Sequence, residues 1–244
     1  MTPSVTVSTL GPLADASAPR WCWLTAITCL LCLIGHGLQA AERPQVFRGG
    51  TILTAAGAEI TNGVLIVQDG KITAVGDAAT PLPADAELID CTGKYLIPGL
   101  VDTHSHLGVY SRPAVGANSD GNESTAPVQT SVRALDALNP QDPGIRMAVA
   151  GGITTANIMP GSANVIGGQT VYVKLRGRTA EEMLIEARDV LGGLKMANGE
   201  NPKRSYGGRG QAPGTRMKVA ALQRAEFVKA RNYQQQWERY RTKL

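Results

Sequence analysis

The sequence is poor in the residues and motifs that most readily reveal a function. Its 244 residues include three histidines, four cysteines and 5% aromatic residues. There is no His-Glu-x-x-His motif, which argues against a metalloprotease of that type. The glycine-rich stretch 160–168 lacks both patterns that cradle nucleotide phosphates, so we expect no nucleotide site there. The apolar fraction of 43% is that of a globular protein with one or two domains.

Cysteine is nearly absent outside the first part of the chain. Three of the four cysteines stand in one apolar run: Cys22, Cys29 and Cys32. This run, residues 21–34, is shorter than the roughly 20 residues that span a bilayer. We interpret residues 1–41 as a signal peptide, with a buried helix or an uncleaved anchor as alternatives. Cleavage would leave Cys91 alone, without an internal disulfide. We therefore expect an exported protein, periplasmic or extracellular, with no stable membrane insertion.

The net charge of +4 is unevenly distributed along the chain. From Lys195 onward there are twelve lysines and arginines against three acidic residues. A nucleic-acid-binding protein would show a recognisable binding module or aromatic residues interleaved with these charges, and neither is present. We interpret this region as a solvated helix face and expect no nucleic-acid partner.

Residues 42–97 predict a small β domain. Asp69-Gly70 separates two apolar runs, 64–68 and 71–75, and is a strong signal for a two-residue hairpin. The strands of this segment are too few for a stable sandwich by themselves. We therefore expect the domain to be incomplete within this chain.

A short apolar strand after Pro98-Gly99 carries the clearest functional signal. Side chains two residues apart in a strand share a face, so Asp102, His104 and His106 are expected to point the same way. Two neutral imidazoles on one face can hold a divalent metal ion. The alternative is that both histidines are merely polar residues at the start of a loop.

Strands and helices alternate after residue 99, which predicts a parallel βα architecture. The expected strands are 153–159, 170–175 and 193–197, and the expected helices are 131–138, 143–150, 180–191 and a long one from Arg216. Residues 107–127 and 198–202 are expected to be loops. The first of these is either a lid over a binding site or simply flexible. An apolar stripe in the last helix is expected to pack in a core: Ala230, Tyr233, Trp237 and Tyr240.

Residues 98–106 resemble the first barrel strand of the metal-dependent amidohydrolase superfamily, in which a His-x-His pair ends strand one. The resemblance continues in both directions and covers nearly everything from residue 46 onward. Residues 49–54 and 63–76 resemble the small β domain of imidazolonepropionase-like members. Three further stretches resemble a bacterial branch of that group: 152–155, 160–169 and 193–204.

The resemblance implies an α/β fold, with a partial (β/α)8 TIM-type barrel in residues 98–244 preceded by a small β-sandwich domain in residues 42–97. A complete barrel needs about 250 residues. The resemblance therefore leads us to expect the N-terminal part of a longer protein.

The resemblance also implies a bridging carboxylate from a middle strand, sometimes supplied by a carboxylated lysine. Lys195 matches that pattern best, with Lys174 and Glu200 as rivals. With His104 and His106, it would hold one or two divalent ions, for which we expect zinc. Asp102 would orient a ligand.

Two later histidines and an aspartate of the family pattern have no counterpart in this sequence. We therefore assign no catalytic residue and expect the chain as written to be inactive or unstable. The expected function of the whole protein is hydrolysis of a non-peptide C–N bond, in an amide or cyclic amide of a small molecule, by a metal-activated water. The alternative is a non-catalytic binding protein, or a decayed fragment, on the same scaffold. The oligomeric state stays open.

Overall fold

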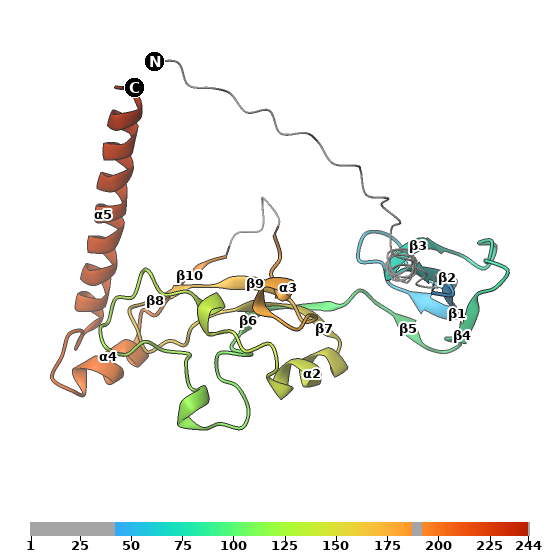
Figure 1. Ribbon diagram of the computed structural model, residues 1–244, viewed down its shortest axis with the longest axis horizontal. Coiled ribbons are helices and arrows are strands. Elements are labelled where there is room, and N and C mark those ends of the chain that lie inside the picture. Colours follow the sequence, from blue (N-terminus) through green and yellow to red (C-terminus); the bar gives the residue numbers. More distant parts are fainter. Residues whose placement is uncertain (1–41, 187–191, 244) are drawn as a thin grey trace, which may run out of the picture. The chain divides into compact units, whose positions relative to one another are not determined.

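The computed structural model describes residues 42–186 and 192–243 (Figure 1). The chain divides into two compact units between Leu96 and Ile97. The predicted signal peptide, residues 1–41, lies outside the described residues. No helix within the described ranges combines the length and the apolarity needed to cross a membrane.

The first unit is a five-stranded sheet in the order β3-β2-β1-β4, with β5 also paired to β1. Its strands are β1 (Gln45–Ile52), β2 (Ile60–Gln68), β3 (Lys71–Gly76), β4 (Glu87–Asp90) and β5 (Tyr95–Leu96). The predicted hairpin between β2 and β3 is confirmed. Asp69 and Gly70 both have positive φ, 50° and 69°, as a type I′ turn requires.

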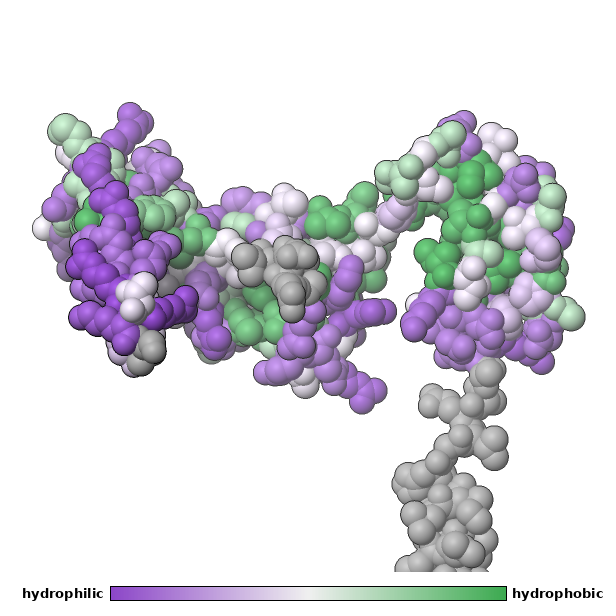
Figure 2. Space-filling view, turned by 90° about the horizontal axis from the view of Figure 1, so that it is seen from above, coloured by the Kyte–Doolittle hydropathy of each residue, from purple (hydrophilic) through white to green (hydrophobic). Residues whose placement is uncertain are grey.

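The core of the first unit is small. Val46, Val64 and Ile66 are buried together on β1 and β2. Leu82 and Leu88 remain exposed, and Figure 2 shows apolar residues reaching the surface of this unit. The described residues form one sheet here, so a β-sandwich remains a prediction.

The second unit mixes strands and helices, in agreement with the α/β class. Its elements are β6 (Leu100–Ser105), α2 (Pro143–Ala150), β7 (Ile153–Ile158), β8 (Ile166–Gln169), β9 (Val171–Lys174), α3 (Ala180–Met183), β10 (Leu194–Met196), α4 (Glu200–Gly207) and α5 (Arg216–Arg241), with 3₁₀ turns at Gly116–Asn118 and Ala134–Ala137. β6 and β7 are parallel and connected through α2 (Figure 1). Asp142 caps α2 by accepting a hydrogen bond from the Gly144 backbone, as its position before Pro143 predicts.

The strands after β7 do not all follow the predicted parallel pattern. β9 runs antiparallel to β7, and β8 pairs antiparallel with β10. The expectation of consecutive parallel βα units is therefore wrong at this point. No helix separates β7 from β9, and a parallel return needs a crossover connection, whereas an antiparallel return does not.

The apolar core of the second unit lies on one face of β7. Ala156 and Ile158 are fully buried and pack in one cluster with Ile145 of α2. Thr155 and Asn157 alternate with them and therefore face the other side, where the Lys174 Nζ donates to Thr155 Oγ1 over 2.9 Å. This opposite face of the sheet is polar.

Three predictions of local structure are wrong. The helix predicted over 131–138 is only a 3₁₀ turn at Ala134–Ala137. The helix predicted over 180–191 ends at Met183, because Leu184 adopts extended backbone and forms a bridge with Val173 (residues 187–191 lie outside the described residues). The loop predicted over 198–202 contains the start of α4 at Glu200. Pro202 is accommodated there because it occupies the first helical turn, where an N–H is not needed.

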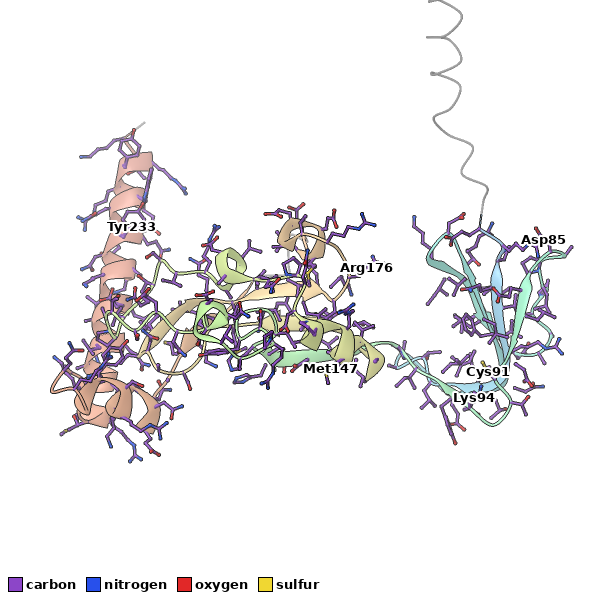
Figure 3. All side chains as sticks on the ribbon, turned by 60° about the horizontal axis from the view of Figure 1, so that its bottom comes forward. Asp85, Cys91, Lys94, Met147, Arg176 and Tyr233 are labelled. Carbon is purple, nitrogen blue, oxygen red and sulfur yellow. The ribbon has the colours of Figure 1, made fainter. Side chains whose placement is uncertain are left out.

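The aromatic stripe of α5 is not core among the described residues. Tyr233, Trp237 and Tyr240 are 62%, 44% and 55% exposed, and Figure 3 shows Tyr233 on this helix. Only Val219, near the start of α5, is buried. The prediction of core packing for this stripe is therefore wrong for the described part of the chain.

Candidate metal centre

The two histidines of the His-x-His pair project from the end of β6 to the same side. Their ring centroids lie 5.3 Å apart and the ring planes are nearly perpendicular, at 87°. Between them, Ser105 is buried and pairs with Ile158, so its side chain faces the core. His104, Ser105 and His106 therefore alternate as the strand period predicts. A register shift lies between Asp102 and Ser105, and Asp102 pairs with Ala156 of β7, so the prediction that Asp102 shares the face of the histidines is not confirmed.

Asp102 acts on the backbone of this pair. Its Oδ1 accepts a hydrogen bond from the His104 backbone N–H over 3.0 Å. This bond restrains the backbone at His104, near the end of β6. Asp102 therefore restrains the backbone of His104, and its role in orienting a ligand, which the resemblance implies, stays a prediction.

The His106 ring is oriented by Met159, the residue that follows β7. His106 Nδ1 lies 2.8 Å from the Met159 carbonyl oxygen, which requires a proton on Nδ1. The Met159 backbone N–H in turn donates to the Ser105 carbonyl over 2.9 Å. Since Nδ1 is the donor, Nε2 of a neutral His106 keeps its lone pair and can bind a metal.

Lys195 reaches the same place from a distant part of the chain. Its Nζ lies 3.2 Å from His104 Nε2 and 3.2 Å from the Met159 sulfur, although 91 residues separate it from His104. β10 carries it there by pairing Lys195 with Gly168 of β8. Burial lowers the pKa of the Lys195 ammonium.

The charge of Lys195 also acts on His104. It is the main cause that lowers the pKa of His104. Partial burial and His106 act in the same direction, and Asp102 opposes them. While Lys195 is an ammonium, the lowered pKa therefore favours the neutral imidazole at His104.

The structure separates Lys195 from its two rivals. Lys174 Nζ is bonded to Thr155, and the Glu200 carboxylate forms an exposed pair with Arg204 at 3.2 Å within α4. Neither side chain is hydrogen-bonded to His104 or His106 in the described part of the chain. Within residues 42–186 and 192–243, no three His, Cys, Asp or Glu side chains gather as a metal site. The set that does gather includes a lysine, and its role as a ligand set stays a prediction.

Sequence reasoning missed two residues beside the histidines. The Tyr110 ring packs edge-on against His106, with centroids 5.6 Å apart and an angle of 85°. The Asn122 side-chain amide donates to the Tyr110 hydroxyl. Both lie in the loop after β6, where composition indicates a loop but no local pattern shows which side chains turn back to the strand.

Asp142 does more than cap α2. It is 2% exposed, and its carboxylate accepts backbone hydrogen bonds from Gly108 (2.9 Å), Arg112 (3.1 Å) and Gly144 (3.0 Å). Burial alone raises its pKa, but the bonds from Gly144, Gly108 and Arg112 outweigh burial and leave the pKa below its usual value. Asp142 therefore ties the loop that follows His106 to the start of α2.

Asn164 has a similar role in the loop after β7. It is 1% exposed and its amide donates to the Ala126 carbonyl and the Tyr206 hydroxyl, each over 2.9 Å. These bonds join the loops after β6 and β7 to α4, which follows the strand of Lys195. The surroundings of the candidate site are thus built from several hydrogen-bonded loops.

Known amidohydrolases are among the proteins that this chain resembles. No family model matches the chain. The amidohydrolase tasK of Hapsidospora irregularis is 38% identical over 178 residues, which are 69% of this chain and 18% of that protein. The imidazolonepropionase of Rhizobium rhizogenes is 47% identical over 55 residues, 21% of this chain and 14% of that protein.

A solved structure covers most of the chain. The crystal structure of an amidohydrolase from Thermotoga maritima MSB8 superposes with a TM-score of 0.71 at 44% identity. The match covers 80% of this chain and 49% of that one. This chain therefore spans half or less of the length of the relatives it matches.

Proposed function

This chain belongs to the amidohydrolase superfamily, and from that premise we propose that it supplies metal ligands to an enzyme that hydrolyses a non-peptide C–N bond. The names of its relatives, amidohydrolase and imidazolonepropionase, support this reaction class. The substrate class that follows is a small amide or cyclic amide. Since the chain spans only part of each relative, the proposal concerns the whole protein to which these residues contribute.

One observation carries the proposal: Lys195 Nζ lies 3.2 Å from His104 Nε2. His104, His106 and Lys195 would hold the metal, one or two divalent ions, for which zinc is the expected identity. A lysine ammonium beside an imidazole would repel a cation, so the set fits a metal only if Lys195 is carboxylated. Carboxylate oxygens and imidazole nitrogens are both established ligands of zinc.

The surroundings of Lys195 suit that modification. The side chain is partly buried, and no salt bridge to it occurs within the described ranges. In carboxylation, the Lys195 ammonium first loses a proton to solvent, and the neutral amine then attacks carbon dioxide. A new N–C bond forms, one C–O π bond opens to an oxyanion, and the nitrogen loses a second proton to solvent. The ammonium is thereby replaced by an anionic carbamate next to His104.

The other residues keep the ligands in place. The Met159 carbonyl fixes the tautomer and the direction of His106, and Asp102 holds the His104 backbone. A divalent metal bound here supplies a water of pKa about 7 and polarises the scissile carbonyl.

We also propose that the protein is exported through the predicted signal peptide, residues 1–41.

The test is metal binding by the full chain, measured by elemental analysis and by Co²⁺ titration. Wild type is expected to bind Co²⁺, and His104→Ala and His106→Ala to lose binding by at least about tenfold. Lys195→Ala should lose it similarly, whereas Lys195→Glu, which retains a carboxylate, should recover part of it. Lys174→Ala is the matched control, because its amine is bonded to Thr155 instead.

Two further readouts complete the test. ¹³C-labelled bicarbonate should give a carbamate signal in NMR that disappears in Lys195→Ala and persists in Lys174→Ala. Equal Co²⁺ binding by wild type and the histidine variants would refute the proposed site. If the whole protein binds metal but hydrolyses no amide or cyclic amide, the non-catalytic alternative replaces the enzyme.

A further inference from the structure

We propose that Tyr110 is a positioning residue for His106, and that Asn122 anchors Tyr110 for this purpose. The inference rests on the proposed function, because it assigns a role in orienting a metal ligand. It concerns two residues in the loop after β6, for which composition alone left open a mobile lid or a flexible segment.

Tyr110 contacts His106 in two ways. Its ring packs edge-on against the imidazole at 5.6 Å, and its backbone N–H donates to the His106 carbonyl over 3.1 Å. The ring of His106 is therefore held from two directions, by the Met159 carbonyl at Nδ1 and by the Tyr110 ring. An imidazole ring restrained only by a hydrogen bond at Nδ1 can still rotate about that bond.

The Tyr110 side chain lies close to the backbone of two glycines, Gly121 and Gly161. A Cβ atom at Gly121 would lie 2.2 Å from the Tyr110 ring, and one at Gly161 would lie 2.4 Å from its hydroxyl. The backbone N–H of Gly161 also donates to the Gly121 carbonyl over 2.6 Å. A Cβ at either position would therefore require the Tyr110 side chain, which is 37% exposed, to shift.

Asn122 holds the Tyr110 side chain in this position by hydrogen bonds. Its amide donates to the Tyr110 hydroxyl, while its Oδ1 accepts from the Ala163 backbone N–H over 3.0 Å. Ala163 and Met159 belong to the same segment, the loop after β7. One segment therefore controls both restraints on His106, directly through Met159 and indirectly through Asn122 and Tyr110.

These contacts restrain the loop after β6 where it lies beside the proposed metal site. Asp142 strengthens this arrangement, since it binds the backbone at Gly108 and Arg112 on either side of Tyr110. Metal ligands must be held within about 0.5 Å of their productive geometry, and neighbouring groups provide that precision. Loss of the tyrosine ring should therefore weaken metal binding without removing a ligand.

The experiment is a Co²⁺ titration of the full chain, followed by visible absorption, which reports the ligand geometry. Tyr110→Ala is expected to weaken Co²⁺ binding about tenfold and to shift the absorption bands. Tyr110→Phe keeps the ring and should lie within about threefold of wild type, with its spectrum. Gly121→Ala, which displaces the ring, should resemble Tyr110→Ala.

Gly116→Ala is the matched control, because a Cβ at that position of the same loop meets nothing within 4 Å. The inference is overturned if Tyr110→Ala matches wild type in affinity and spectrum, or if its loss of Co²⁺ merely accompanies a loss of thermal unfolding cooperativity. If wild type binds no Co²⁺, the proposed metal site fails and this inference fails with it. If wild type binds Co²⁺ and Tyr110→Ala binds it with the same affinity and spectrum, only the role of Tyr110 is refuted and the proposed metal site stands.

Discussion

The two compact units of this chain differ in how much apolar surface they bury. The main core of the second unit contains ten buried apolar residues, from β7, β9, α2, α3 and the adjoining loops. The core of the first unit contains three, all from β1 and β2. Since burial of apolar surface is the main favourable term in folding, the second unit has the larger stabilising core and is the one that holds the candidate site.

The difference between the two cores is tested most directly by shortening one central side chain in each. Ile158→Ala in the second unit should cost about 2–5 kcal/mol of unfolding free energy, because it removes a fully buried side chain. Val46→Ala in the first unit removes two methyl groups and should cost about 2 kcal/mol. Urea unfolding measures both effects, and Ile72→Ala, 65% exposed, is the control.

The same experiment separates the units if Co²⁺ binding is measured alongside. Ile158→Ala should weaken Co²⁺ binding, since Ile158 ends β7 directly before Met159, whose carbonyl orients His106. Val46→Ala should leave Co²⁺ binding unchanged. Equal loss of metal binding in both variants would mean that the two units unfold together.

A second prediction concerns the buried carboxylate of the second unit. Asp142→Ala removes the acceptor of three backbone hydrogen bonds and should cost about 2–3 kcal/mol, measured by urea unfolding. Asp136→Ala is the control, because its carboxylate forms an exposed pair with Arg133. A cost below that of the control would show that water replaces the carboxylate without penalty.

The third prediction is the pH dependence of that carboxylate. The folded-state pKa of Asp142 is lower than its unfolded value, so its contribution to stability is complete above the unfolded pKa of about 3.9. It is lost as the pH falls through the lower, folded pKa. The stability difference between wild type and Asp142→Asn should therefore be constant near neutral pH and shrink below about pH 4. A difference that is constant down to pH 2 would contradict this assignment.

The smallest effect is expected on α5. Trp237→Ala, at a position 44% exposed, should change the unfolding free energy by no more than about 0.5 kcal/mol. Circular dichroism during thermal unfolding measures it, with Gln236→Ala as a neighbouring control. A cost above about 1.5 kcal/mol would show that the aromatic stripe packs against something in solution.

Much of the fold could be predicted wherever neighbouring residues decide the structure. The Asp69-Gly70 hairpin was predicted and found, and it depends on residues within a few positions, as does the cap that Asp142 forms before Pro143. The end of the helix at Met183 and the direction of β9 could not be predicted in this way. Both depend on pairing with a strand distant in the sequence, which overrides the local helix signal and the simple alternation of elements.

By itself, the sequence determined that His104 and His106 leave one strand on the same side, because a β-strand repeats every two residues. The resemblance singled out Lys195, but only the tertiary structure brought its amine to His104 across 91 residues. The tertiary structure alone also turned Tyr110 and Asn122 back towards His106. The physical reason is that strand periodicity is a property of the local backbone, whereas these contacts depend on how β6, β7 and β10 place their loops in space.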